Sequence, residues 1–123
     1  MAEQGPGKGA ARSDRRRLYQ LQAQLLRALA HPARIEILEL LRDGERCVCE
    51  FESLLGLRQP NISQHLAVLR AAGLAVTRRE GLRVLYSVAD PAIFDVLEEV
   101  RGIIGRQGAG VTEAVSRADA AVS

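Results

Sequence analysis

The feature that most constrains the fold of this chain is a change of hydrophobic period at Gly73. Before this glycine, apolar residues recur at helical spacing in two short segments, residues 50–56 and 59–72. After it, residues 74–88 alternate between apolar and polar, with Glu80-Gly81 as a candidate hairpin turn. Two short helices joined by a tight link form a helix-turn-helix, and a hairpin directly after them forms a wing. The sequence therefore predicts a winged helix-turn-helix, which is a mainly α fold with a small β-hairpin.

Further helices are expected on both sides of this unit. One begins at Asp14 and carries leucines at helical spacing, a second opens at Pro32 and ends at Asp43-Gly44, and a last one follows the capping pair Asp90-Pro91. The predicted order is helix-helix-helix-helix-hairpin-helix. Within the hairpin, the residues expected to point inward are Val76, Val84, Tyr86 and Val88.

The length of the chain favours one compact domain with extended ends. Its 123 residues are 47% hydrophobic and 26% charged, which lies within the globular range. We expect the folded domain to span residues 14–106. Residues 1–13 are rich in Gly, Pro and Ala and predict a disordered tail, and residues 107–123 predict a flexible tail.

The apolar stripes of the first and last helices exceed what so small a core can bury. Pairing them with a second copy is the economical solution, so the sequence predicts a twofold homodimer through its terminal helices. The residues expected at this interface are Leu18, Leu21, Leu25, Ile93, Leu97, Val100 and Ile104.

The segment from Gln59 to Arg70 has the composition of a helix that reads DNA. Ile62, Leu66 and Leu69 share one side of a helical wheel. Opposite them lie Gln64, Ala67 and Pro60, with Asn61, Ser63 and Val68 at the flanks. Asn and Gln side chains can pair with adenine, and arginines in the wing suit backbone phosphates. Each residue alone is compatible with an ordinary polar surface, but together they favour double-stranded DNA. The candidate DNA contacts are Arg58, Gln59, Asn61, Ser63, Gln64, His65, Arg78, Arg79 and Arg83. Of these, His65 lies at the boundary of the apolar side, where a packed residue is the more common outcome.

Cys47 and Cys49 are the two cysteines of the chain. Structural disulfides usually join distant segments, so a pair at this spacing predicts metal binding or redox sensing instead. The sequence shows neither a signal peptide nor an apolar stretch of about 20 residues, so we expect a cytoplasmic protein without a membrane partner. An enzyme is not expected, because Cys47 and His65 lack a third, orienting group.

The chain resembles the ArsR/SmtB family of dimeric winged-helix repressors. The matching residues are Leu29 to Ile35, Cys47-Val48-Cys49-Glu50, Gln59 to Leu69, Ala72-Gly73-Leu74 and the wing from Gly81 to Tyr86. The resemblance implies the same fold and repression of a resistance or efflux operon. It also implies release when an effector binds, with no cofactor required for DNA binding itself. The predicted dimer would present two recognition helices about one DNA turn apart, roughly 34 Å, which matches an inverted-repeat DNA operator.

The arsenic-sensing branch of the family carries the same Cys-Val-Cys, followed by a third cysteine where this chain has Glu52. The resemblance thus makes Cys47 and Cys49 the metal site, with arsenite as the first choice and mercury, cadmium, zinc or copper as alternatives. Glu52, an external thiol or hydroxide, or a cysteine of the partner subunit would complete it. The alternative is a repressor that responds to thiol oxidation or persulfidation of the same cysteines.

A mechanism follows if both cysteines lie in regular helix. Residues two apart on an α-helix point about 200° away from each other, so they could not bind one ion together. Effector binding would then distort the start of this helix and displace residues 59–70 from the DNA groove.

Overall fold

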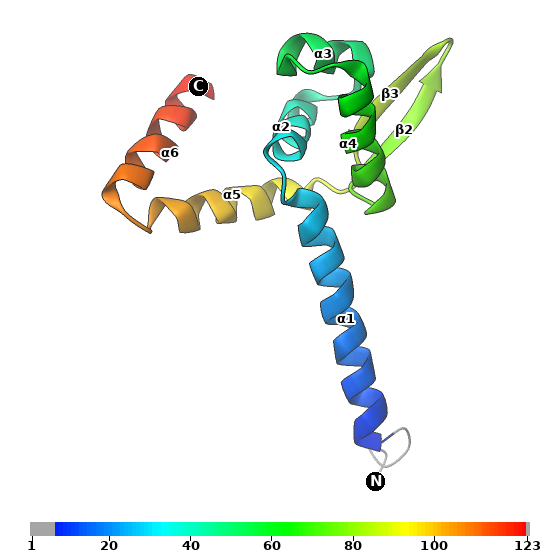
Figure 1. The fold of residues 1–123 in the computed structure, drawn as a ribbon, viewed down its shortest axis with the longest axis vertical. Coiled ribbons are helices and arrows are strands. Elements are labelled where there is room, and N and C mark those ends of the chain that lie inside the picture. Colours follow the sequence, from blue (N-terminus) through cyan, green and yellow to red (C-terminus); the bar gives the residue numbers. More distant parts are fainter. Residues whose placement is uncertain (1–6, 123) are drawn as a thin grey trace.

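The computed structural model describes residues 7–122, and within them the fold is helical with one small sheet. Its elements are α1 (Gly7–Leu29), α2 (Pro32–Leu40), the 3-10 helix η2 (Leu41–Asp43), β1 (Arg46–Cys47), α3 (Val48–Leu55), α4 (Gln59–Ala71), β2 (Ala75–Glu80), β3 (Arg83–Val88), α5 (Ala92–Gly105) and α6 (Ala109–Val122). In Figure 1, α2, α3 and α4 gather beside the β2–β3 hairpin, and α1 extends away from them as a single long helix. The predicted winged helix-turn-helix is confirmed. None of the helices within residues 7–122 is long and apolar enough to cross a membrane.

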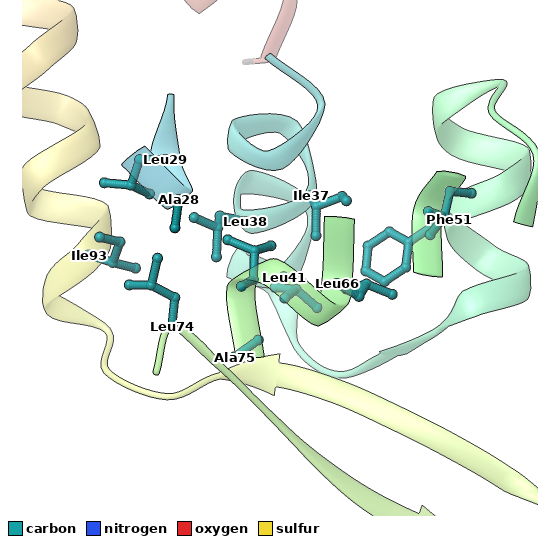
Figure 2. Close-up of a cluster of buried hydrophobic side chains, with 12 residues drawn as sticks. Ala28, Leu29, Ile37, Leu38, Leu41, Phe51, Leu66, Leu74, Ala75 and Ile93 are labelled. Carbon is teal, nitrogen blue, oxygen red and sulfur yellow. The ribbon is translucent and has the colours of Figure 1, made fainter. Parts of the chain in front are cut away.

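The core joins α2, α3 and α4 into one unit. Its largest fully buried side chains are Phe51, Ile37, Leu38, Ile62, Leu66 and Leu69. Figure 2 shows how Phe51 of α3 meets Leu66 of α4, with Leu38 and Leu41 beside them. Burial of each such side chain contributes about 1.5–3 kcal/mol, so these contacts fix the position of α4 within the protomer.

The sheet has the strand order β1-β3-β2, and both pairs are antiparallel. β2 and β3 meet around the predicted turn, where Glu80 pairs with Arg83. The two-residue strand β1 was not expected from the sequence, and it places Cys47 opposite Leu85 of β3.

The hairpin register corrects one of the expected inward residues. Val76 pairs with Ser87, so it lies on the opposite face from Tyr86 and Val88, and it is exposed. Tyr86 and Val88 pack against the core as predicted, and Val84 is half-buried. Leu85, on the face that the alternation assigned to solvent, is buried beside β1.

Both ends of the chain contain more helix than the sequence predicts. α1 begins at Gly7 rather than at Asp14, so residues 7–13 of the expected disordered tail are helical. This segment contains Ala10 and Ala11, and alanine has the highest helix propensity. Likewise, the expected flexible tail contains α6, which is tied to α5 by an ion pair between Arg101 and Asp119. Residues 1–6 and 123, which belong to the two predicted tails, lie outside the described residues.

Candidate nucleic-acid interface and thiol pair

α4 turns a polar side to solvent. α3 ends at Leu55 and is capped by Gly56, whose left-handed conformation (φ 68°) is one that glycine adopts without a steric penalty. α4 then opens with Pro60 in its first turn. Ile62, Leu66 and Leu69 face the core with no exposed surface. The predicted DNA contacts that are exposed on or next to this helix are Arg58, Gln59, Asn61, Ser63 and Gln64.

His65 differs from the other candidates on α4, because its side chain is engaged within the protomer. The imidazole Nδ1 accepts a hydrogen bond from Arg34 Nε at 3.3 Å, and the ring centroid lies 4.4 Å from that of His31. Arg34 also donates to the carbonyl oxygens of Arg27 and Ala28 at the end of α1. Burial, followed by the electrostatic effect of the neighbouring His31 and Arg34, lowers the pKa of His65. His65 therefore ties α4 to the corner between α1 and α2.

The three wing arginines have unequal surroundings. Arg78 donates to both carboxylate oxygens of Glu45, at 2.7 and 2.8 Å, and to Glu80 at 3.0 Å. These hydrogen bonds raise the pKa of Arg78, and the bond from Arg78 lowers the pKa of Glu45. Within residues 7–122, Arg79 is exposed and forms no ion pair. Its charge is thus the most available to a phosphate.

The cysteines do not both lie in regular helix, which corrects the premise of the helix-distortion mechanism. Cys47 is extended (φ −91°, ψ 166°) and belongs to β1, whereas Cys49 lies in the first turn of α3. The change from strand to helix between them brings both side chains to the same side. Their Cα atoms are 5.5 Å apart, and the two sulfur atoms are joined in a disulfide. When reduced, the pair can face one ion without unwinding of α3.

Burial distinguishes the two cysteines. Cys47 is 6% exposed, because β3 covers one side of β1, while Cys49 is exposed at the start of α3. A reagent from solvent therefore meets Cys49 first.

A neighbour that the sequence reasoning missed is Glu50. Its Oε1 accepts a hydrogen bond from the Cys47 backbone N–H at 3.0 Å, and its Oε2 accepts one from Arg46 Nη1 at 3.2 Å. Arg83 Nη2 also lies 3.7 Å from Oε1. The signal that could have found it is the acid three residues after Cys47, the spacing of a helix-capping pair.

Glu52, the predicted candidate for a third metal ligand, is exposed on α3. Across the described part of the chain, no group of three or more His, Cys, Asp or Glu side chains is placed to hold a metal ion. One protomer thus offers two sulfur ligands side by side rather than a closed three-ligand site.

The residues expected at a dimer interface divide into two sets. Leu18, Leu21, Leu25, Val100 and Ile104 are exposed on α1 and α5. Ile93 is 6% exposed within the protomer's own core, and Leu97 packs against that core. The prediction for Ile93 is corrected accordingly, because the first turn of α5 faces inward.

Comparison with known proteins supports the fold. Residues 31–76 match the model of the bacterial regulatory protein arsR family. An uncharacterised HTH-type transcriptional regulator of Mycobacterium tuberculosis, Rv0081, is 47% identical over 90 residues, which are 72% of this chain and 79% of that protein. Its crystal structure aligns with a TM-score of 0.67 over 72% of this chain and 90% of that one.

Two further relatives extend the comparison. A probable mercury resistance operon repressor of Streptomyces lividans is 39% identical over 75 residues, which are 61% of this chain and 60% of that protein. Mb0332 from Mycobacterium bovis is a possible regulator whose homodimeric winged helix-turn-helix domain has a solution structure. The sequence of this domain is 30% identical to the present chain. The structure of the domain aligns with a TM-score of 0.68 over 76% of this chain and 86% of that one.

Proposed function

The chain belongs to the arsR family of bacterial regulatory proteins, and from this membership we propose that it is a homodimeric repressor whose operator is released when a thiophilic ion binds Cys47 and Cys49. Family membership establishes the broader activity, a DNA-binding transcriptional regulator. The observation that carries the proposal is the placement of the thiol pair. β1, which holds Cys47, is hydrogen-bonded into the same sheet as the wing, and α3, which holds Cys49, packs against α4.

DNA recognition is proposed for the exposed side of α4. Asn61 and Gln64 can each form two hydrogen bonds with an adenine in the major groove, and Arg79 can pair with a phosphate. In a twofold dimer the two copies of α4 would lie about one DNA turn apart, roughly 34 Å, which suits an inverted repeat. The homodimeric structure of Mb0332 supports this arrangement.

The donor set suits a soft ion that accepts two ligands. Thiolates select soft ions such as mercuric and cuprous ions, which two sulfurs alone can hold. Zinc and cadmium require further ligands, and arsenite prefers a third sulfur. For arsenite, that third ligand would be an external thiol or hydroxide, Glu52 or a cysteine of the partner subunit. The mercury resistance operon repressor among the relatives supports the choice of a thiophilic ion.

Release follows from a change at the junction of β1 and α3. An ion held by both sulfurs would fix the relative position of Cys47 and Cys49, and with it the angle at which α3 leaves the sheet. Because Phe51 of α3 packs with Leu66 of α4, a shift of α3 is transmitted to the recognition helix. The wing receives the same shift through β3.

The experiment is fluorescence anisotropy of the reduced protein on DNA from its own promoter. Mercuric, cuprous, arsenite, cadmium and zinc ions are titrated separately, with the double variant Cys47→Ser/Cys49→Ser beside the native protein. We expect release by one ion in the native protein alone. The variant Ser53→Ala, changed on the same helix, is the matched control and should respond like the native protein. Release of the double variant by the same ion would contradict the proposal.

A second candidate is a thiol-redox repressor, and the disulfide between Cys47 and Cys49 is the observation that favours it. Oxidation by a peroxide removes two electrons and two protons from the thiol pair and yields the disulfide and water. In the same assay, peroxide would release the native protein and a reducing dithiol would restore binding, without any metal ion present. Persulfide donors are titrated in the same anisotropy assay as a third reagent class.

A further inference from the structure

We propose that Glu50 is a positioning residue that connects the thiol pair to the wing, because its carboxylate competes with DNA phosphate for Arg83. The state of Cys47 and Cys49 then sets the strength of that competition. This inference rests on the proposed function and names the route by which the thiol pair lowers DNA affinity.

The geometry centres on one oxygen atom. Glu50 Oε1 accepts the Cys47 backbone N–H at 3.0 Å and also lies 3.7 Å from Arg83 Nη2. The other oxygen, Oε2, accepts a hydrogen bond from Arg46 Nη1, and Arg46 Nε is itself fixed by the carbonyl oxygen of Leu40 at 2.9 Å. Glu50 is therefore held firmly on the side of the thiol pair and loosely on the side of the wing.

Both contacts of Oε1 use one oxygen atom, whose two lone pairs can accept from both donors. While the Cys47 N–H offsets part of the charge on this oxygen, Arg83 remains at a distance that is long for a hydrogen bond and is free to turn towards a phosphate. A change at Cys47 and Cys49 that withdraws this N–H leaves Oε1 without its donor. Since a half-buried carboxylate binds charged donors strongly, Arg83 then moves closer to Glu50 and away from the DNA.

Arg83 lies where its movement between Glu50 and a phosphate would change DNA affinity. Arg83 opens β3 immediately after the hairpin turn, and its side chain is half exposed at 58%. Arg79, on the neighbouring strand, forms no ion pair within the described residues and lacks a comparable link to the thiol pair. The inference therefore concerns Arg83, one of the three wing arginines, and leaves Arg79 as an internal control.

The experiment measures how strongly mercuric ion weakens operator binding by the full-length protein. The ratio of the Kd for DNA with saturating mercuric ion to the Kd without it is the coupling factor. Glu50→Gln keeps an oxygen for the Cys47 N–H but removes the negative charge that attracts Arg83. We expect this variant to bind DNA more tightly without the ion. We also expect its coupling factor to fall by about two- to five-fold, the size of a partly exposed ion pair.

Three further variants separate this role from a structural one. Arg83→Gln should lower the coupling factor by the same amount, and Glu50→Gln should have no further effect in that background. Arg79→Gln should weaken DNA binding and leave the coupling factor unchanged. Mercuric ion should bind the free Glu50→Gln protein as tightly as it binds the native protein, because both sulfur ligands remain. If Glu50→Gln does not fold, Arg83→Gln still tests the link from the side of the wing.

The outcomes distinguish this inference from the proposed function. If Cys47→Ser/Cys49→Ser abolishes release while Glu50→Gln and Arg83→Gln keep the native coupling factor, the inference is overturned and the proposed function stands. If mercuric ion leaves the native complex intact, the inference is overturned, and the proposed function is tested by the other four ions. If mercuric ion releases the double cysteine variant as well as the native protein, both are overturned.

Discussion

The hydrogen bond between Arg34 and His65 requires a neutral imidazole. Nδ1 of His65 can accept from Arg34 Nε only while it carries no proton of its own. Burial, followed by the electrostatic effect of the neighbouring His31 and Arg34, lowers the pKa of His65 from its usual value of 6.5. When pH falls through that value, the unfolded chain therefore takes up the proton before the folded one. The stability that this hydrogen bond contributes is present above the unfolded pKa and decreases towards acid pH.

This linkage predicts that His65 makes the free energy of unfolding depend on pH. The free energy of unfolding should fall as pH is lowered from about 7.5 to about 5.5, and His65→Gln should flatten this dependence, because glutamine accepts from Arg34 without titrating. Urea unfolding at both pH values, at one fixed protein concentration, measures the effect. Equal slopes in the native protein and the variant would assign the pH dependence to other groups.

At the scale of the element, the neighbouring arginines Arg78 and Arg79 of the hairpin differ in their contacts. Arg78 links β2 to Glu45 ahead of β1, whereas Arg79 projects from the same strand without an ion-pair partner within residues 7–122. Neighbours in sequence thus have different roles, because successive residues of a strand face opposite sides.

Substitution of these two arginines should therefore have different effects on DNA binding. Arg79→Gln should weaken binding to operator and unrelated DNA alike. It should also reduce the slope of log K against log salt by about 0.9 for each phosphate that is no longer neutralised. Arg78→Gln should change the slope less, since its charge is already neutralised by Glu45 and Glu80. Anisotropy titrations over a series of salt concentrations measure both. A larger slope change for Arg78→Gln would reverse the assignment.

The elements that could be predicted are those with a local signal. Pro32, Pro60, Gly56 and Gly73 mark helix ends through their own backbone preferences, so α2, α3, α4 and the hairpin were found close to their observed positions. β1 could not be found, because two residues carry no periodicity and become a strand only by pairing with β3.

The same limit applied to the candidate site. The exposed polar side of α4 follows from its helical period and was predicted. The face of Leu85, the partners of Arg78 and the role of Glu50 depend on strand register and on contacts between distant segments. The disulfide also depends on the strand-to-helix change at Cys47, which the spacing of the two cysteines does not reveal.

At the scale of the whole molecule, α1 leaves much apolar surface without cover in the protomer. It stands apart from the body in Figure 1, and Leu18, Leu21, Leu25 and Leu26 are all exposed on it. α5 adds Val96, Val100 and Ile103 to this exposed set. Apolar surface on this scale marks an interaction site, and a second copy is the proposed occupant.

Charged substitutions on α1 should therefore dissociate the proposed dimer. Leu21→Glu/Leu25→Glu should sediment as a monomer that keeps its helical circular dichroism, because neither side chain belongs to the buried core. The variant should lose most of its operator affinity, since one recognition helix contacts only a half-site. Leu54→Glu, at an equally exposed leucine on α3, is the matched control and should remain dimeric. A dimeric Leu21→Glu/Leu25→Glu protein would locate the interface elsewhere.

The shortness of β1 has a consequence for response time. A strand of two residues opens by breaking few hydrogen bonds, so local opening should be frequent compared with global unfolding. Exposed Cys49 can react at a rate that rises with reagent concentration, but buried Cys47 must wait until β1 opens. Once reagent is abundant, the rate at which the pair closes on its effector should reach a plateau. The delay between exposure and transcription would then be a kinetic constant of the protein, independent of the dose.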